Sequence, residues 1–270
     1  MRFKLTLKTQ PGQYLPINYQ YELGSWMYRV FSQADKSYAD FLHREGYRPA
    51  AQADAHGAFQ AVHHYKLFSF SQLHIPQREV IKDRIVIQSP LISLMVGFRI
   101  GPAAERFIAG LFRDQEFRLG DRLTQVDLQV KRVEARPELV DRDTLTLQTR
   151  SPMVVSRGRP NGHAEYLSPA DPEFGVRMVE NLRQKYLSSL PTPVACDMLP
   201  AQHEEIPDIQ FVPVGKPPRS RLVTIRAHRE EEVRVRGYHF RFRLQAPIEL
   251  LETGLDAGFG GKNSMGFGFC

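Results

Sequence analysis

The order of the predicted secondary-structure elements is the feature that most constrains the fold of this 270-residue chain. Residues 2–7 alternate polar and apolar side chains, which predicts a half-buried strand. The next segment predicts a helix with Asn18 as its N-cap, because apolar residues recur there at helical spacing on one stripe. The stripe consists of Leu23, Trp26, Met27, Val30 and Phe31. A second helix is predicted over residues 35–45, ending at Gly46.

Four more elements complete the first half of the chain. Residues 65–70 and 80–88 predict two strands, residues 101–112 predict a helix, and residues 123–133 predict a further strand. The resulting order is β, α, β, β, α, β, which is typical of a ferredoxin-like domain.

The second half repeats this order of elements, although no sequence repeat is visible. A strand over residues 144–155 is interrupted by Pro152, and a helix over residues 171–190 carries an apolar residue at every fourth position. Three strands and a short helix then precede a glycine-rich end; their ranges are 209–214, 221–227, 233–244 and 247–255. We therefore predict an α+β protein with two tandem ferredoxin-like domains, residues 1–137 and 138–270.

The glycine-rich end, residues 258–268, predicts a loop that holds phosphate. Five glycines lie among a lysine, an asparagine and a serine in this segment, and consecutive backbone N–H groups of such loops can bind an anion. Its predicted ligand-binding residues are Gly258, Gly260, Gly261, Lys262, Asn263 and Ser264. The alternative is a glycine-rich turn into a last edge strand over residues 265–269.

Nucleotide-binding loops do not fit this segment. A P-loop needs a strand before it, a Ser or Thr after its lysine and a helix beyond. Here Lys262 precedes Asn263, a predicted helix comes before the loop, and eight residues follow Lys262. A dinucleotide fingerprint fails because it must open a βαβ unit. With mononucleotide and dinucleotide loops excluded, the remaining candidate ligand is nucleic acid, bound through its phosphate backbone.

Composition agrees with a polyanion partner without identifying it. The formal net charge is +6, and an excess of basic residues attracts polyanions. Cys196 and Cys270 lie too far apart for a CxxC zinc motif and form no disulfide framework, so we expect a reducing, cytoplasmic setting. The chain has neither an apolar signal region nor an apolar run of spanning length, and we expect no membrane association.

Arginines are densest around the predicted strand 233–244. Arg234 and Arg236 share one face, whereas Arg241 and Arg243 have the opposite parity. A bulge at Gly237 would return all four to one face. We predict that Arg234, Arg236 and Arg241 contact phosphate, the alternative being a solvated sheet face.

Histidine, tyrosine and lysine side chains supply the candidates for chemistry. His43 lies at the end of the second predicted helix, and His63 and His64 precede a strand. Tyr28 lies about 130° from the centre of the apolar stripe, taking 100° per residue. Lys66 is a third candidate. The alternatives are that Tyr28 is a surface tyrosine and that Lys66 is an exposed strand lysine, neither with a role in chemistry. No metal-ligand spacing is present, so metal-independent chemistry is favoured and no cofactor is expected.

These segments together resemble a known family. The end GFGGKNSMGFG resembles the glycine-rich signature of the CRISPR-associated repeat-RNA endoribonucleases, the "Cas-six" members of the repeat-associated mysterious protein superfamily. The segments MRFKLTLK, LPINYQYELGSWMYRVF, YADFLHREGY and YKLFSFSQL are similar to the first half of that family. The segments LTLQTRSPMVV and YHFRFRLQAPIELLETGLDAGFG are similar to its second half.

The resemblance implies two tandem RNA-recognition-type domains and cleavage of CRISPR precursor RNA within each repeat. It implies a metal-independent reaction that leaves a 5′-hydroxyl and a 2′,3′-cyclic phosphate. By position, His43, Tyr28 and Lys66 match a catalytic set, and residues 258–268 match an RNA-contacting loop. An insertion-like stretch, residues 49–60, separates His43 from Lys66, so His63 and His64 compete for a role.

Two other functions share the same fold and basic surface. One is a non-catalytic repeat-RNA-binding subunit of a CRISPR effector complex, which needs no catalytic histidine. The other is a general binder of single-stranded RNA, which would show no preference for repeats. The expected partners are therefore CRISPR repeat RNA and the other subunits of such a complex.

Overall fold

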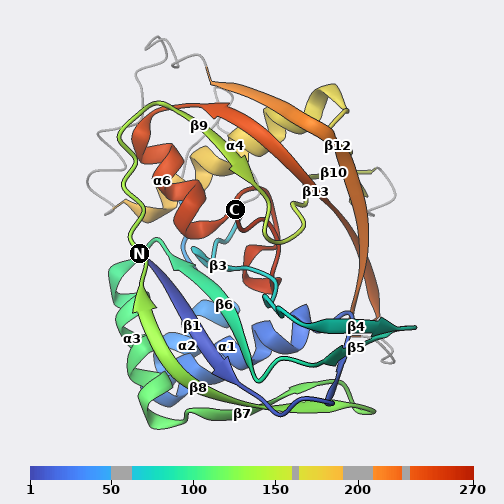
Figure 1. Cartoon of the computed structure of the whole chain (residues 1–270). Helices are drawn as coiled ribbons and strands as arrows, with labels where there is room; N and C mark the ends of the chain where they lie inside the picture. Colours follow the sequence, from blue (N-terminus) through green and yellow to red (C-terminus); the bar gives the residue numbers. More distant parts are fainter. Residues whose placement is uncertain (50–62, 160–163, 191–208, 227–231) are drawn as a thin grey trace.

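The computed structural model describes the whole chain except residues 50–62, 160–163, 191–208 and 227–231. Figure 1 shows two halves, with the first half of the chain below, the second half above, and the C-terminal segment between them. Each half contains an antiparallel sheet and helices, in agreement with the predicted α+β class. Among the described residues, no helix is both long and apolar enough to cross a membrane.

The first half is built on a five-stranded sheet in the order β3-β6-β1-β8-β7. Its strands are β1 (Arg2–Lys8), β3 (Phe68–Phe70), β6 (Leu91–Phe98), β7 (Glu116–Gly120) and β8 (Gln125–Ala135). The helices of this half are α1 (Gln20–Ala34), α2 (Lys36–Arg44) and α3 (Gly101–Arg113). Strands β8, β1, β6 and β3 are the four strands of the ferredoxin-like unit, and β7 adds a hairpin at its edge.

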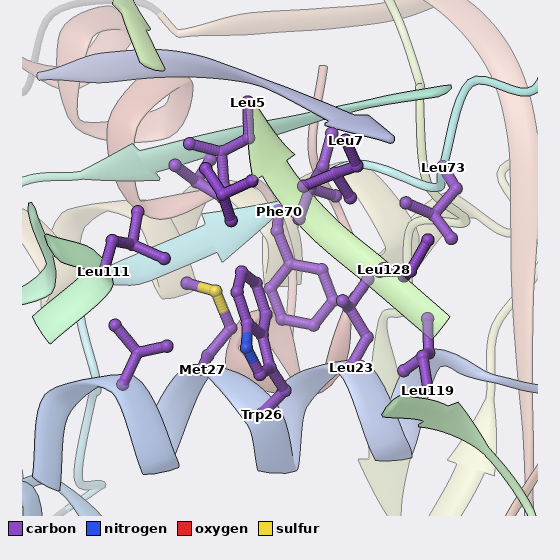
Figure 2. Packing of buried hydrophobic residues seen from close by; sticks show 14 of the residues in the cluster. Leu5, Leu7, Leu23, Trp26, Met27, Phe70, Leu73, Leu111, Leu119 and Leu128 are labelled. Atoms are coloured by element: carbon purple, nitrogen blue, oxygen red, sulfur yellow. The ribbon is translucent and has the colours of Figure 1, made fainter. Parts of the chain in front are cut away.

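One large apolar core joins α1 and α3 to this sheet (Figure 2). The predicted stripe of α1 is buried, and Trp26 stacks on Phe117 with ring centroids 4.1 Å apart. Asp35 caps α2 by accepting a hydrogen bond from the Tyr38 amide, and Gly46 ends that helix as predicted. The predicted N-cap at Asn18 is wrong, because α1 begins after Tyr19 and has no side-chain cap.

The central strand β6 was not predicted as a strand, and the predicted strand 80–88 is not part of this sheet. Residues 78–87 form the hairpin β4 (Arg78–Ile81) and β5 (Arg84–Ile87), which pairs with β2 (Tyr14–Pro16). Strand β6 has mostly apolar residues on both faces, and α6 (Ile248–Ala257) of the second half packs on the face that carries Gly97. Gly97 permits that approach: a Cβ there would lie 2.6 Å from the Asp256 carbonyl oxygen. A strand covered on both faces loses the alternation by which strands are recognised.

The second half is built on a three-stranded sheet in the order β12-β13-β9. Its elements are β9 (Thr144–Gln148), β10 (Ser156–Gly158), β11 (Ala164–Tyr166), α4 (Pro172–Ser189), β12 (Gln210–Ile225), β13 (Val233–Gln245) and α6 (Ile248–Ala257). The predicted strands 209–214 and 221–227 are one strand, β12, although Ala227 lies outside the described residues.

The predicted bulge at Gly237 is wrong. Gly237 pairs regularly with Arg221, and the register of the β12–β13 pair shifts between Val214 and Arg219 instead. The irregular residues belong to β12, the edge strand, where prolines that cannot donate to the ladder are tolerated.

The chain end takes the place of a fourth strand without forming one. A 3₁₀ turn, η1 (Asn263–Met265), precedes it, and Gly266 and Gly268 have φ of +85° and +71°. A strand cannot contain these left-handed residues, so the alternative of an edge strand over residues 265–269 is wrong. The segment instead bonds to the chain after β9, where the Arg150 amide donates to the Phe269 carbonyl at 2.7 Å.

Buried contacts join the two halves. A small apolar cluster contains Val154, Val223 and Phe267 of the second half, and Tyr21 of α1 packs against it. Arg226 lies over the Tyr21 ring and donates to its hydroxyl at 3.2 Å. Arg2 of β1 is buried, donates to the Cys270 carbonyl and lies over the Phe269 ring. The halves are therefore packed against each other through side chains as well as through β6 and α6.

Candidate functional site

The three residues predicted to carry chemistry lie together in the structure. The rings of Tyr28 and His43 meet edge to face with centroids 5.4 Å apart. The Lys66 ammonium donates to the backbone carbonyl of His43 at 3.1 Å. His43 is exposed, whereas Tyr28 and Lys66 are half-buried. An imidazole, a phenol and an ammonium group thus share one surface of the first half.

The end of α2 explains how Lys66 reaches His43 across a gap of 22 residues in sequence. Gly46 has φ of +70° and turns the chain at the end of the helix. Tyr47 then forms an antiparallel bridge with Tyr65, the residue before Lys66. A Cβ at Gly46 would lie 2.7 Å from the Tyr65 carbonyl oxygen and 3.1 Å from the Lys66 Nζ atom. Only glycine leaves room for this arrangement.

A cavity of about 1050 Å³ opens beside this cluster, between the two halves of the molecule. The first half contributes residues 63–68, and the second half contributes residues of α4 and the glycine-rich loop. Among the described residues that line it are four basic side chains and two carboxylates. The basic residues are Lys66, Arg177, Lys185 and Lys262, and the acidic residues are Glu173 and Glu180. Burial lowers the pKa of Lys66, because a desolvated ammonium is less stable than one in water.

His63 and His64 line the cavity together with Lys66, whereas His43 and Tyr28 are not among the residues that line it. His64 is fixed by a short contact of 2.6 Å between its Nδ1 atom and the Glu45 carbonyl oxygen. His43 differs from both because it contacts Tyr28 and, through its carbonyl, Lys66. His43 is therefore the histidine that contacts both other candidates, Tyr28 through its ring and Lys66 through its backbone carbonyl.

The glycine-rich loop of the second half reaches the cluster of the first half directly. The Ser264 side chain interacts with the Tyr28 hydroxyl, although burial is the larger effect on Tyr28 and raises its pKa. Gly24 on α1 makes room for this contact, since a Cβ there would lie 2.9 Å from the Ser264 carbonyl oxygen. The predicted glycine-rich loop and the catalytic candidates of the first half thus lie next to each other.

The loop has a defined shape that its own residues maintain. Gly258, Gly260 and Lys262 all have left-handed φ, at +86°, +66° and +60°. The Asn263 amide is buried and donates to the carbonyls of Phe259 and Phe267 at 3.2 and 3.0 Å. Lys262 and Ser264, the residues before and after Asn263, both line the cavity. Asn263, predicted to bind a ligand, has its amide nitrogen bonded within the loop.

Lys185 is a residue of the site that the sequence analysis missed. It lies on α4, is only 2% exposed, and donates to the carbonyls of Gly258 and Gly260 at 2.7 and 2.6 Å. Burial lowers the pKa of its ammonium group to about 7. Spacing by four residues predicted that Tyr186 follows Leu182 on the apolar face of the helix. In the structure the buried residues that follow Leu182 are Lys185 and Ser188. The sequence carried a signal for this, because a residue three positions after Leu182 lies on the same face of a helix.

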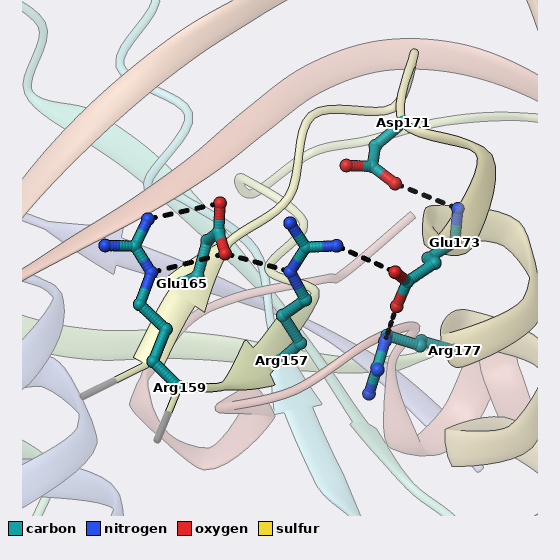
Figure 3. A network of polar contacts seen from close by, with 6 residues as sticks. All are labelled: Arg157, Arg159, Glu165, Asp171, Glu173 and Arg177. Carbon is teal, nitrogen blue, oxygen red and sulfur yellow. Dashed lines mark hydrogen bonds and ion pairs between the residues drawn. The ribbon is translucent and has the colours of Figure 1, made fainter. Parts of the chain in front are cut away.

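A polar network lies at the edge of the cavity, where the β10–β11 hairpin meets the start of α4 (Figure 3). Glu173 accepts from Arg157 at 2.7 Å and from Arg177 at 2.8 Å. Glu165 accepts from Arg157 and Arg159, and these two hydrogen bonds lower its pKa to about 2. Three arginines thus share two carboxylates, and Asp171 adds a third carboxylate at the start of α4.

The arginines predicted to bind phosphate lie on β13, outside the cavity lining. Arg234, Arg236 and Arg241 are all exposed. Arg236 donates to the Ser220 hydroxyl at 2.7 Å, and Arg234 lies 3.5 Å from a Glu232 carboxylate oxygen. Because Gly237 pairs regularly, Arg234 and Arg236 have one parity along β13 and Arg241 has the other. In the part of the chain that the structure describes, no group of three metal-ligating side chains could hold an ion.

Tandem ferredoxin-like domains that meet at a cationic cavity define the architectural class of this protein. Family models agree: "CRISPR associated protein Cas6, C-terminal" matches residues 134–270, and "CRISPR-associated protein Cas6, N-terminal" matches residues 14–134. The chain belongs to the Cas6 family of CRISPR-associated proteins.

Individual relatives support this membership. The chain is 27% identical over 271 residues to "CRISPR-associated endoribonuclease Cas6 1" of Methanocaldococcus jannaschii, covering 99% of this chain and 91% of the relative. It is 25% identical to "CRISPR-associated endoribonuclease Cas6" of Pyrococcus furiosus, covering 94% and 82%. A solved structure of a Cas6-related gene product from Pyrococcus furiosus superposes with a TM-score of 0.74 at 22% identity, covering 100% of this chain and 96% of the other. That likeness establishes the shared fold.

Proposed function

We propose that this Cas6-family endoribonuclease cleaves CRISPR precursor RNA within each repeat, without a metal ion. In the proposed reaction the 2′-oxygen beside the scissile bond attacks phosphorus, and the bond from phosphorus to the 5′-oxygen breaks. The products are a 2′,3′-cyclic phosphate and a 5′-hydroxyl. The observation that carries the proposal is the contact between Tyr28, His43 and Lys66 beside a cationic cavity between the two halves.

Each residue of the cluster has a role suited to its chemistry. His43, the exposed imidazole, serves as the general base or general acid, taking the 2′-hydroxyl proton or protonating the leaving 5′-oxygen. Lys66 uses one of its three N–H donors on the His43 carbonyl and has two left to stabilise charge on the phosphorane. Tyr28, held by Ser264, positions the 2′-hydroxyl or shares the proton transfer. In-line alignment of the two oxygens supplies much of the rate enhancement.

RNA binding is assigned to two surfaces. Lys262 and Ser264 at the cavity, with the backbone of Gly258, Gly260 and Gly261, are proposed to hold the RNA backbone near the scissile phosphate. The exposed arginines of β13 (Arg234, Arg236 and Arg241) are proposed to contact phosphates farther along the repeat. Asn263 contributes by shaping the loop. We place the boundary between the two domains after residue 137, close to residue 134 where the two family models meet.

The decisive experiment compares the wild-type protein with His43→Ala on cognate repeat RNA in EDTA. We expect the wild-type protein to cut once per repeat and the variant to cut roughly 10²–10⁴ times more slowly, since it lacks the proton-transfer group. RNA affinity is expected to stay within about twofold, because His43 acts on the transition state more than on binding. Single-turnover rates and filter binding measure the two quantities, and the cyclic phosphate is identified by mass spectrometry of the product.

His63→Ala provides the matched control and should cleave at close to the wild-type rate. Wild-type cleavage by His43→Ala with loss of cleavage by His63→Ala would transfer the catalytic role to His63. Tight binding of repeat RNA by the wild-type protein without any cut would support the non-catalytic subunit of an effector complex. Equal binding of a scrambled repeat would support a general single-strand binder.

A further inference from the structure

Lys185 is a buried basic side chain whose bonding partners belong to the glycine-rich loop. Its Nζ atom lies 2.7 Å from the Gly258 carbonyl oxygen and 2.6 Å from the Gly260 carbonyl oxygen. Transfer of an ammonium group into a protein interior is unfavourable unless hydrogen bonds compensate for the lost water. The two loop carbonyls supply that compensation, so the lysine and the loop stabilise each other's placement.

The loop contacts two further parts of the site beyond these carbonyls. The backbone amide of Gly261 donates to the Val154 carbonyl at 2.7 Å. The side-chain amide of Asn263 donates to the carbonyls of Phe259 and Phe267 within the loop. Ser264 then meets the hydroxyl of Tyr28. The loop is thus hydrogen-bonded to α4 through Lys185 and lies against α1 at Gly24 and Tyr28.

Gly260 gives the loop little freedom to reach another conformation. A Cβ at this position would lie 2.4 Å from the Val154 carbonyl oxygen, and its φ of +66° is left-handed. The backbone passes through a narrow space here, and its Gly258 and Gly260 carbonyls are held by Lys185. Loss of the lysine would leave both of those acceptors without the donor that holds them in place.

We propose that Lys185 is a positioning residue, which acts through the Gly258 and Gly260 carbonyls to hold Lys262 at the cavity and Ser264 at Tyr28. The inference rests on the proposed function insofar as the loop holds RNA and Tyr28 assists cleavage. Lys185 does not touch the reacting atoms in this scheme. It determines whether the loop of the second half and the catalytic cluster of the first half keep their relative placement.

The test is Lys185→Met, which removes the donor while keeping a long, flexible side chain that is stable when buried. We expect amide hydrogen exchange across residues 259–267 to accelerate roughly tenfold while exchange in β1, β6 and β13 stays unchanged. Repeat-RNA affinity should fall roughly tenfold, and the single-turnover rate at saturating RNA should fall as well. Arg183→Met, on the same helix, is the matched control and should leave all three quantities unchanged.

Unchanged loop exchange and unchanged RNA affinity in Lys185→Met would overturn the proposal. Acceleration throughout the sheets, equal to that of the loop, would also overturn it, since that pattern indicates a general structural role. If Lys185→Met does not fold, Lys185→Gln takes its place: its amide retains a donor, and exchange confined to the loop should rise by a smaller factor. Loop exchange and RNA binding are measured without any cleavage, so failure of the proposed nuclease activity is distinguished from failure of this inference.

Discussion

Burial of Lys185 makes the stability of the fold depend on pH. Its pKa is about 7 in the folded protein, whereas the ordinary lysine value of 10.5 applies to the unfolded chain. Between these two values the unfolded state binds more protons than the folded state, so the free energy of unfolding rises with pH. Below pH 7 both states are protonated, and this dependence disappears.

The corresponding prediction is a difference in slope between the wild-type protein and Lys185→Met. From pH 7 to pH 9 the free energy of unfolding of the wild-type protein should rise by about 2 kcal/mol relative to the variant. Urea unfolding at the two pH values measures the difference, and the subtraction removes the contribution of every other titrating group. Parallel slopes would show that Lys185 titrates near its ordinary value in the folded protein.

At the scale of single residues, the sequence alone gave the catalytic candidates but only part of their surroundings. Tyr28, His43 and Lys66 were identified by residue type, position on a helix and resemblance, and the structure brings them into contact. Ser264 was predicted only as an RNA-binding residue, although it interacts with Tyr28 in the other half. Lys185 was missed because a strict fourfold spacing passes over a position that the 3.6-residue turn places on the buried face.

At the scale of elements, α4 connects the polar network in Figure 3 to the loop, because it carries Glu173 at its start and Lys185 near its end. Asp171 caps this helix by accepting a hydrogen bond from the Glu173 amide at 2.9 Å. Asp171→Ala should lower the free energy of unfolding by about 1 kcal/mol, because one helix N–H loses its acceptor. Chemical denaturation measures this loss.

Asp171→Asn is the control for the cap, since its side-chain oxygen still accepts the hydrogen bond. We expect it to retain most of the stability and to lose only the favourable interaction of the negative charge with the helix N-terminus. An equal loss in Asp171→Asn and Asp171→Ala would show that the charge, and not the capping hydrogen bond, stabilises the start of α4.

Strand β6 shows why one element could not be predicted from local pattern. Its residues are mostly apolar on both faces: the core of the first half covers one face, and α6 of the second half approaches the other at Gly97. The predicted strand over residues 80–88 lies instead in the hairpin β4–β5. Whether a second domain covers a strand distinguishes β6 from the β4–β5 hairpin, and the local sequence does not contain that information.

At the scale of the whole molecule, the proposed function assigns RNA binding to two surfaces, the cavity between the halves and the exposed arginines of β13. Replacing both Arg234 and Arg236 by Gln should weaken repeat-RNA binding and reduce the slope of log affinity against log salt by about 1.5, because fewer counterions are released. Binding measured at several salt concentrations in the His43→Ala background, which leaves the RNA intact, tests this expectation.

Replacement of Arg118 and Arg132 by Gln is the charge-matched control for that measurement. Both arginines are exposed on the sheet of the first half and form ion pairs with neighbouring carboxylates, Asp127 and Glu134. This control should change the salt slope much less than the β13 variant. The same change in both variants would show that β13 contributes only through net charge.

The sequence by itself determined the α+β class, the order of most elements, the buried face of α1 and the residue types available for chemistry. It could do so because periodicity, caps and turn residues are local properties that a chain carries whatever its neighbours are. Only the tertiary structure decided that β6 is central, that the chain end replaces a strand, and that Lys185 and Ser264 join the glycine-rich loop to α4 and Tyr28. The contacts of Lys185 and Ser264 join residues 73 or more positions apart, and such long-range packing leaves no periodic signal in either segment.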